Sequence, residues 1–314
     1  MFFALVFPLT WALNPLNSLK KLFLVAASYL FYGFWNGHFC LLLLASSTLA
    51  YVAGIIIDRS SGNRRRLALW AAIAADLAIL GYFKYSNFLS AEVANVSGLF
   101  GTPIDLGSFE MALPVAISFI TFHAISYVVD VYDRRVRATR SYDDLLLYIA
   151  FFPHLVAGPI VRAELFLPQL AGPSDPGSIR LGDSVRLILG GLFKKVVLAS
   201  HLATLYVDPL YVTPSSQTSF DLWLGLYAYA LVIYCDFSAY TDIAIGIANL
   251  LGYRFPQNFD QPYRAQTIAD FWRRWHMTLS NWLRQYVYIP LGGNRHGRLA
   301  TAGNLMITML LGGL

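Results

Sequence analysis

The sequence has little charge for its length. Only 13% of its 314 residues are charged, against roughly 25% in an ordinary soluble domain, and 57% are hydrophobic. The mean hydropathy is +0.53. Because so few charges would cover the surface of a soluble protein only thinly, this composition excludes a disordered chain and a typical soluble enzyme. It is typical of a protein whose surroundings are largely lipid.

Cysteines and nucleotide or metal motifs are also scarce. The two cysteines, Cys40 and Cys235, lie far apart in apolar stretches, and we interpret them as small buried side chains rather than a disulfide. The sequence has no Cys/His cluster with metal-ligand spacing, no P-loop, no Gly-x-Gly-x-x-Gly and no cleavable signal peptide over residues 1–13. We therefore expect no bound metal or cofactor. The net charge of +5 does not indicate nucleic acid, because basic excess in membrane proteins usually belongs to cytoplasmic loops.

Long apolar stretches are the main feature that the sequence does contain. A membrane-spanning helix needs about 20 apolar residues, and several stretches reach or approach that length. They are residues 1–13, 22–35, 39–57, 67–83, 113–131, 145–160, 187–206, 222–251 and 303–314. Broken or polar segments at membrane depth survive only where protein buries them or where they line a wet cavity. The sequence therefore predicts one all-α, polytopic membrane domain over residues 1–314 with a polar interior.

The distribution of arginine and lysine predicts the orientation of the loops. Two arginine-rich loops, residues 58–66 and 133–144, are expected in the cytoplasm by the positive-inside rule. Between them residues 85–133 contain no lysine or arginine, which places residues 90–111 outside. Residues 196–253 also lack both, so the loop over residues 208–219 is expected outside as well.

Residues 254–298 carry seven arginines and only two acids. Thr267 and Asp270 have the spacing of a helix N-cap and its acid, and the pattern predicts one helix from there to about residue 288. The aromatic side chains of this helix share one face. The opposite face carries Asp270, Arg273, Ser280 and Arg284. Arginine binds carboxylate or phosphate with two parallel hydrogen bonds, so this second face can meet an anion.

His276 lies at the edge between these two faces and is the candidate catalytic residue. A neutral imidazole can take a proton from a hydroxyl or thiol at physiological pH. The alternative is a structural histidine that is hydrogen-bonded to Ser280 or to a backbone carbonyl. A single histidine on a helix does not decide between the two.

Asp236, Asp242 and His154 are further candidates. Acids inside a membrane are costly and usually face a partner or a water-filled cavity, so Asp236 and Asp242 either form a polar wall of a channel or pair with arginines of residues 254–298. His154 lies among two prolines and a glycine in residues 152–160 and is a candidate cavity-lining residue. His123 is interpreted as a hydrogen-bonded core residue.

Several segments resemble the membrane-bound O-acyltransferase family, and specifically its bacterial alginate O-acetyltransferase branch. They are residues 113–122, 126–132, 151–160, 234–246, 256–260, and 271–280 with 288–295. They occur in family order and span most of the chain. The resemblance implies a ring of helices, with short re-entrant or broken helices, around a central funnel in the bacterial inner membrane.

The resemblance also implies a reaction and its components. Acetyl-CoA is the expected cytoplasmic donor, and its acetyl group passes across the membrane to an exopolysaccharide, most simply alginate. Periplasmic or membrane-anchored acetyltransferases of a polysaccharide-modification complex are the expected partners. His276 matches one of two family histidines. Arg273 and Arg284 become candidate contacts to the donor phosphates, and Ser280, Asp236, Asp242 and His154 candidate channel residues.

The second family histidine follows a Leu-Leu-Gly-Gly-Leu stretch in a Trp-His-Gly motif. Residues 310–314 match that stretch, so we expect the sequence to be C-terminally incomplete, with this histidine and several helices beyond residue 314. Activity of the 314-residue piece alone is not expected.

Other functions stay open on the sequence. The same family chemistry serves acetylation of peptidoglycan or cellulose, and D-alanyl transfer to teichoic acid. A transporter or flippase without acyl-transfer chemistry would also use broken helices and a polar site at the membrane midplane. The absence of an internal repeat counts against the transporter.

Overall fold

The computed structural model describes residues 1–101 and 113–313, and all regular structure within them is helical. These residues form two compact units. The first comprises Met1–Lys20, Ala157–Val161 and Ala171–Leu314, and the second Lys21–Val156 and Arg162–Leu170. The all-α prediction is confirmed. The prediction of one domain over residues 1–314 stays a prediction, and each unit is described by itself.

Four helical stretches are long and apolar enough to cross a membrane. They are α3 (His38–Arg59), α4 (Gly62–Leu99), the stretch Leu181–Val212, and α12 (Ser219–Leu250). Two shorter apolar helices are α1 (Phe2–Ala12) and α5 (Ile117–Tyr132). A further helix, α2 (Asn17–Gly33), contains the boundary between the units. The prediction of a multi-pass membrane protein is therefore confirmed.

The second unit is built on α3, α4 and α5, which pack against one another. Gly54 of α3 makes this packing close, because a Cβ there would lie 2.7 Å from the Tyr127 ring of α5. Three short helices complete the unit: α6 (Tyr142–Ala150), α7 (Phe152–Leu155) and α8 (Ala163–Phe166). Tyr148 of α6, Phe166 of α8 and Phe151, which connects α6 to α7, are fully buried.

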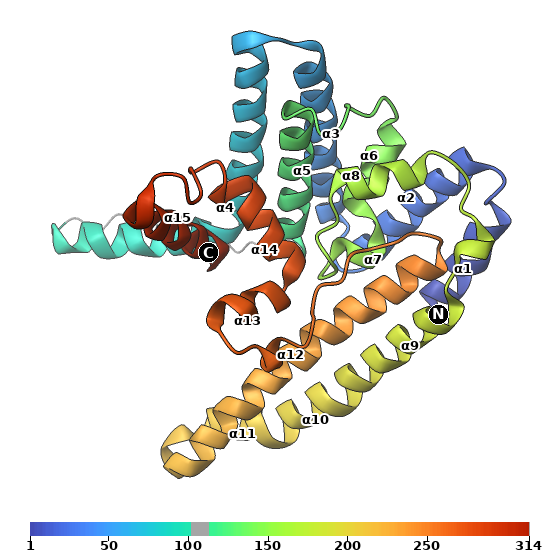
Figure 1. Cartoon of the computed structure of the whole chain (residues 1–314). Helices are drawn as coiled ribbons and strands as arrows, with labels where there is room; N and C mark the ends of the chain where they lie inside the picture. The colour runs from blue at the N-terminus through green and yellow to red at the C-terminus, as the bar shows by residue number, and fades with distance from the viewer. Residues whose placement is uncertain (102–112, 314) are drawn as a thin grey trace. The chain divides into compact units, whose positions relative to one another are not determined.

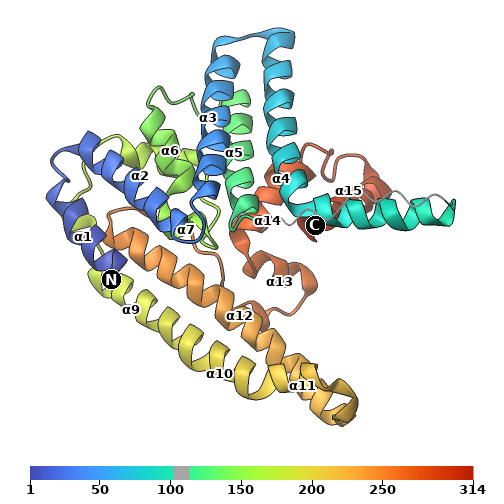
Figure 2. The same ribbon diagram turned by 180° about the vertical axis from the view of Figure 1, so that it is seen from behind.

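The first unit is built on α9 (Leu181–Leu192) packed against α12, which run side by side in Figures 1 and 2. Glycines allow this approach. A Cβ at Gly191 would lie 2.7 Å from the carbonyl oxygen of Ala239, and one at Gly246 would lie 2.9 Å from that of Ser184. Small residues at helix crossings are a common way for membrane helices to pack closely.

The stretch Leu181–Val212 is not a uniform α-helix. Wider π-helical turns, Phe193–Ala199 and Ala203–Val207, alternate with α10 (Ser200–Leu202) and α11 (Asp208–Val212). π-helical turns are rare and occur often at functional sites. The first of them contains Lys194 and Lys195.

Two predicted boundaries are wrong. The helix expected over residues 67–83 continues to Leu99 as α4, so residues 90–99 of the predicted outside loop are helical. Residues 102–111 of that loop, and Leu314, lie outside the described residues. The single helix expected over residues 267–288 is broken. It consists of α13 (Ile268–Arg274), α14 (Met277–Leu283) and the π-helical turn Arg284–Tyr288, followed by α15 (Gly297–Gly313).

Candidate active site

His276 lies at the break between α13 and α14, as the N-cap residue of α14. Its backbone is left-handed, with φ 42° and ψ 54°. For a residue with a side chain this conformation costs on the order of 1–3 kcal/mol and persists only where the surroundings enforce it. The N-cap Thr267 of α13 does accept a hydrogen bond from the Asp270 backbone N–H, as predicted. The single helix that was expected to carry His276 at the edge between its two faces does not form.

The backbone of residues 258–260 replaces the helical hydrogen bonds lost at this break. The N–H of Met277 donates to the carbonyl oxygen of Asn258 at 2.9 Å, and the N–H of Asp260 donates to that of Arg274 at 2.9 Å. In a continuous helix the Arg274 carbonyl would instead accept from the N–H of Thr278. That N–H donates to the Asn258 side chain. The left-handed turn at His276 is therefore imposed by a neighbouring segment.

The Asn258 side chain is the centre of this network and is fully buried. Its Oδ1 lies 3.2 Å from the backbone nitrogen of Thr278, 3.0 Å from Thr278 Oγ1 and 3.0 Å from His276 Nδ1. Because a backbone N–H can only donate, the amide atom facing it is the oxygen. His276 Nδ1 must then be the protonated nitrogen. The contact fixes the neutral tautomer, with the lone pair on Nε2.

Thr278 links the same network to the segment Ala157–Val161. Its Oγ1 accepts a hydrogen bond of 3.0 Å from the buried backbone N–H of Ile160. This segment overlaps residues 151–160, which include Ile160, and Asn258 is part of residues 256–260. Parts of three family-like segments, residues 151–160, 256–260 and 271–280, thus meet at Asn258 and Thr278 within the first unit.

Aromatic rings enclose the His276 side chain. The ring of Phe237 from α12 packs with an edge-to-face angle of 86° at 4.7 Å, and the Phe259 ring stacks at 6.5 Å. Phe259 packs in turn on Trp275 at 5.1 Å. His276 is 9% exposed and lies outside the membrane-spanning helices. Burial lowers the pKa of its imidazole to about 4, so the side chain is neutral at pH 7.

The charged residues of this region have two different environments. Arg274 is ion-paired with Asp270 at 3.0 Å and with Asp260 at 3.5 Å. Arg273 and Arg284 are exposed and form no ion pair within the described part of the chain. Ser280 Oγ donates to the Trp275 carbonyl oxygen at 3.3 Å, and the partner of His276 Nδ1 is Asn258 Oδ1, where Ser280 or a backbone carbonyl was expected for a structural histidine.

Asp236 and Asp242 on α12 pair with lysines of the first π-helical turn. Lys194 donates to Asp242 at 2.6 Å and to Ser238 Oγ at 3.0 Å, and Lys195 donates to Asp236. The predicted pairing with arginines of residues 254–298 is therefore wrong. The extra width of a π-helical turn directs two consecutive lysines towards α12.

His154 lies in the second unit and is fully buried. Its ring stacks on that of His123 at 4.7 Å, and its Nε2 donates to the Tyr148 carbonyl oxygen at 3.0 Å. His123 Nδ1 donates to the Phe119 carbonyl oxygen at 2.7 Å, as expected of a hydrogen-bonded core residue. A channel role for His154 stays a prediction.

Sequence reasoning did not single out Asn258 and Thr278. Residues 256–260 were recognised as a family segment, but a buried asparagine has no periodic signal. What identifies it is the structure, where one amide oxygen accepts three hydrogen bonds.

The free thiols of Cys40 and Cys235 agree with the interpretation that they form no disulfide.

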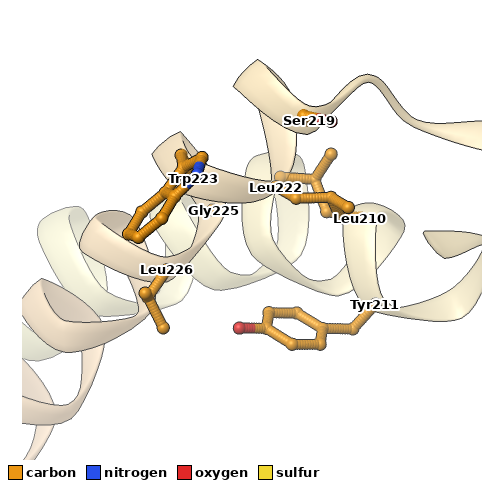
Figure 3. Close-up of a pocket in the computed structure, with 7 residues that line it drawn as sticks. All are labelled: Leu210, Tyr211, Ser219, Leu222, Trp223, Gly225 and Leu226. Carbon is orange, nitrogen blue, oxygen red and sulfur yellow. The ribbon is translucent and has the colours of Figure 1, made fainter.

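An apolar hollow of about 430 Å³ lies where α11 approaches the start of α12 (Figure 3). It is lined by Leu210, Tyr211, Ser219, Leu222, Trp223, Gly225 and Leu226. This lining offers shape and apolar surface, and its chemistry differs from that around His276.

Comparison with known proteins gives a consistent family. The sequence model of the family described as "MBOAT, membrane-bound O-acyltransferase family" matches residues 135–314. A probable alginate O-acetylase of Pseudomonas aeruginosa is 40% identical over 94% of this chain and 56% of its own length. A peptidoglycan O-acetyltransferase of Helicobacter pylori is 36% identical over 96% of the chain and 61% of its own length. A teichoic acid D-alanyltransferase of Bacillus subtilis is 28% identical over 81% of this chain and 62% of its own length. The chain therefore spans less than two thirds of the length of each of these relatives.

Proposed function

This chain belongs to the membrane-bound O-acyltransferase family, and we propose that the protein passes an acyl group from a cytoplasmic thioester across the membrane for O-acylation of a polysaccharide. We propose acetyl-CoA as the donor, alginate as the acceptor and the bacterial inner membrane as the location. The relatives named alginate O-acetylase support this choice. The expected partners are periplasmic or membrane-anchored acetyltransferases that complete the modification.

The observation that carries the proposal is the fixed neutral tautomer of His276. Its Nδ1 is held by Asn258 Oδ1, so Nε2 presents a lone pair as a base. In the proposed step an acceptor oxygen attacks the thioester carbonyl carbon, the carbon–sulfur bond breaks, and Nε2 accepts the hydroxyl proton. The imidazolium then returns the proton to the departing thiolate, which leaves as the free thiol. Proton transfer by a positioned side chain typically contributes 10²–10⁴-fold to a rate.

The remaining candidates have supporting roles in this proposal. Arg273 and Arg284 are exposed and can contact an anionic donor. Asp236 and Asp242, held by lysines, and Ser280 belong to the polar wall along which the acyl group moves. His154 is proposed as a channel residue of the second unit.

The test is acyl transfer by the whole protein reconstituted with its partners and radiolabelled acetyl-CoA. His276→Asn removes the imidazole while keeping a residue type that tolerates left-handed backbone. We expect its rate of label transfer into alginate to fall by at least about 100-fold. His296→Asn, a change at an exposed histidine of the same region, is the matched control and is expected to keep the wild-type rate.

Each outcome has a defined meaning. Unchanged transfer in His276→Asn at normal protein level contradicts the role of His276. If the label enters peptidoglycan instead of alginate, the acceptor is peptidoglycan, the polymer in the name of the Helicobacter pylori relative. A wild-type protein that never consumes its thioester contradicts the acyltransferase proposal and favours a transporter.

A further inference from the structure

A second, polar pocket of about 220 Å³ lies in the first unit, where α12 ends and α9 begins. It is lined by Ser178, Arg180, Asn249, Gly252, Tyr253, Arg254 and Phe255. Drug-sized ligands occupy pockets of about 300–1,000 Å³, so this pocket accommodates one chemical group rather than a whole large molecule. Two arginines and no acid in its lining indicate that the group is an anion.

A buried cation adds to the positive charge. Lys20 is 1% exposed, and its Nζ donates to Asn14 Oδ1 and Ser174 Oγ at 3.1 Å each. The same Nζ lies 5.6 Å from the centre of the ring of Tyr253, which is also one of the residues that line the pocket.

The nearest acids in the sequence are engaged elsewhere. Asp175 Oδ1 accepts a hydrogen bond from the Gly177 backbone N–H, and Asp183 is ion-paired with Arg186 at 3.2 Å. Arg180 has no carboxylate partner among residues 1–101 and 113–313. The charge of Arg180 at the pocket is therefore not neutralised by an ion pair within these residues.

The position of the pocket identifies its side of the membrane. α9 and α12 are antiparallel, and the connection between them, residues 208–219, is predicted outside by the positive-inside rule. The residues that line the pocket adjoin the opposite ends of both helices, where α9 begins and α12 ends, so we expect the pocket on the cytoplasmic side.

We propose that this pocket binds a phosphate group on the cytoplasmic side. Arginine presents a planar fork of N–H donors that matches phosphate oxygens, and the volume fits one such group. Two molecules carry phosphate at this surface: the nucleotide end of a coenzyme A thioester and the headgroup of an anionic phospholipid. The first source rests on the proposed function, and the second is independent of it.

The experiment measures binding directly, with the whole protein in nanodiscs. In phosphatidylcholine discs, equilibrium dialysis measures binding of radiolabelled adenosine 3′,5′-bisphosphate, which carries phosphates but no thioester. We expect Arg180→Gln and Arg254→Gln each to weaken it about tenfold, and Arg180→Lys, which keeps the charge, to weaken it less. Arg298→Gln removes an equal charge at an exposed site outside the pocket and is expected to bind as wild type.

A second arm replaces phosphatidylcholine with phosphatidylglycerol and measures the thermal unfolding midpoint. Stabilisation by phosphatidylglycerol that disappears only in the Arg180 and Arg254 glutamine variants identifies the lipid as the source. Wild-type behaviour of both variants in both arms overturns the proposal, whatever the protein's activity. Failure of the proposed function is distinguishable, because it shows as absent acetyl transfer by a wild-type protein whose phosphate binding is intact.

Discussion

The hydrogen bond from the Ile160 backbone N–H to Thr278 Oγ1 gives the sharpest test of the site's construction. In Thr278→Val the side chain keeps its size but loses the hydroxyl that accepts this hydrogen bond. Ile160 is 3% exposed, so water does not replace the acceptor. Leaving a buried donor unsatisfied costs about 1–3 kcal/mol. Asn258 Oδ1 keeps two N–H donors, from His276 and Thr278, and contributes little to this cost.

Amide hydrogen exchange, read at Ile160 by mass spectrometry, measures this local cost without any need for activity. Because about 1.4 kcal/mol is a factor of ten in an equilibrium constant, we expect exchange at Ile160 to be about 5- to 150-fold faster in Thr278→Val. Thr278→Ser keeps the hydroxyl and is the matched control, with exchange close to wild type. Equal exchange in wild type and Thr278→Val, or equal acceleration in both variants, would refute the reasoning.

Two further predictions concern the histidine environment and the helix packing. Asn258→Asp places a carboxylate 3.0 Å from His276 Nδ1. A neighbouring negative charge favours the imidazolium, so the pKa of His276, about 4 in the wild type, should rise by about 1–3 units. The acid limb of the pH profile of kcat/KM should then move to higher pH by the same amount. An acid limb that stays in place, or moves to lower pH, contradicts the assigned contact. Gly191→Ala forces a methyl to within 2.7 Å of α12 and should cost about 1–3 kcal/mol, seen as a lower thermal midpoint, whereas Gly190→Ala has open space and should not lower it.

The membrane helices were largely predictable because hydropathy is a local property. The stretch 39–57 corresponds to α3, and 222–251 corresponds to α12. The end of α4 was not predictable from hydropathy. Residues 84–99 are more polar but contain no proline, so the helix continues after the apolar run ends.

The break at His276 was not predictable from periodicity either, because its cause lies in another segment. Residues 267–288 have the pattern of one helix, but Asn258 and Asp260 take the hydrogen bonds that would continue it. His276 was singled out from its place between two helix faces and from the segment that resembles the family, and its catalytic role stays a prediction. Its tautomer and its partner depend on contacts between residues 18 positions apart, which a local pattern does not encode.

The π-helical turns before α11 have a consequence for how this part of the chain tolerates insertions and deletions. Each such turn holds one residue more than an α-helical turn, and one residue corresponds to about 100° of rotation about the helix axis. Removing a single residue within Phe193–Ala199 would let an ordinary turn form there. Because that turn would still complete 360° with one residue fewer, the helix from Ser200 onward would keep nearly the same orientation relative to α9. A one-residue deletion within the α-helical part, Leu181–Leu192, would instead rotate the rest of the stretch by about 100° and turn its apolar side chains to a different direction in the bilayer.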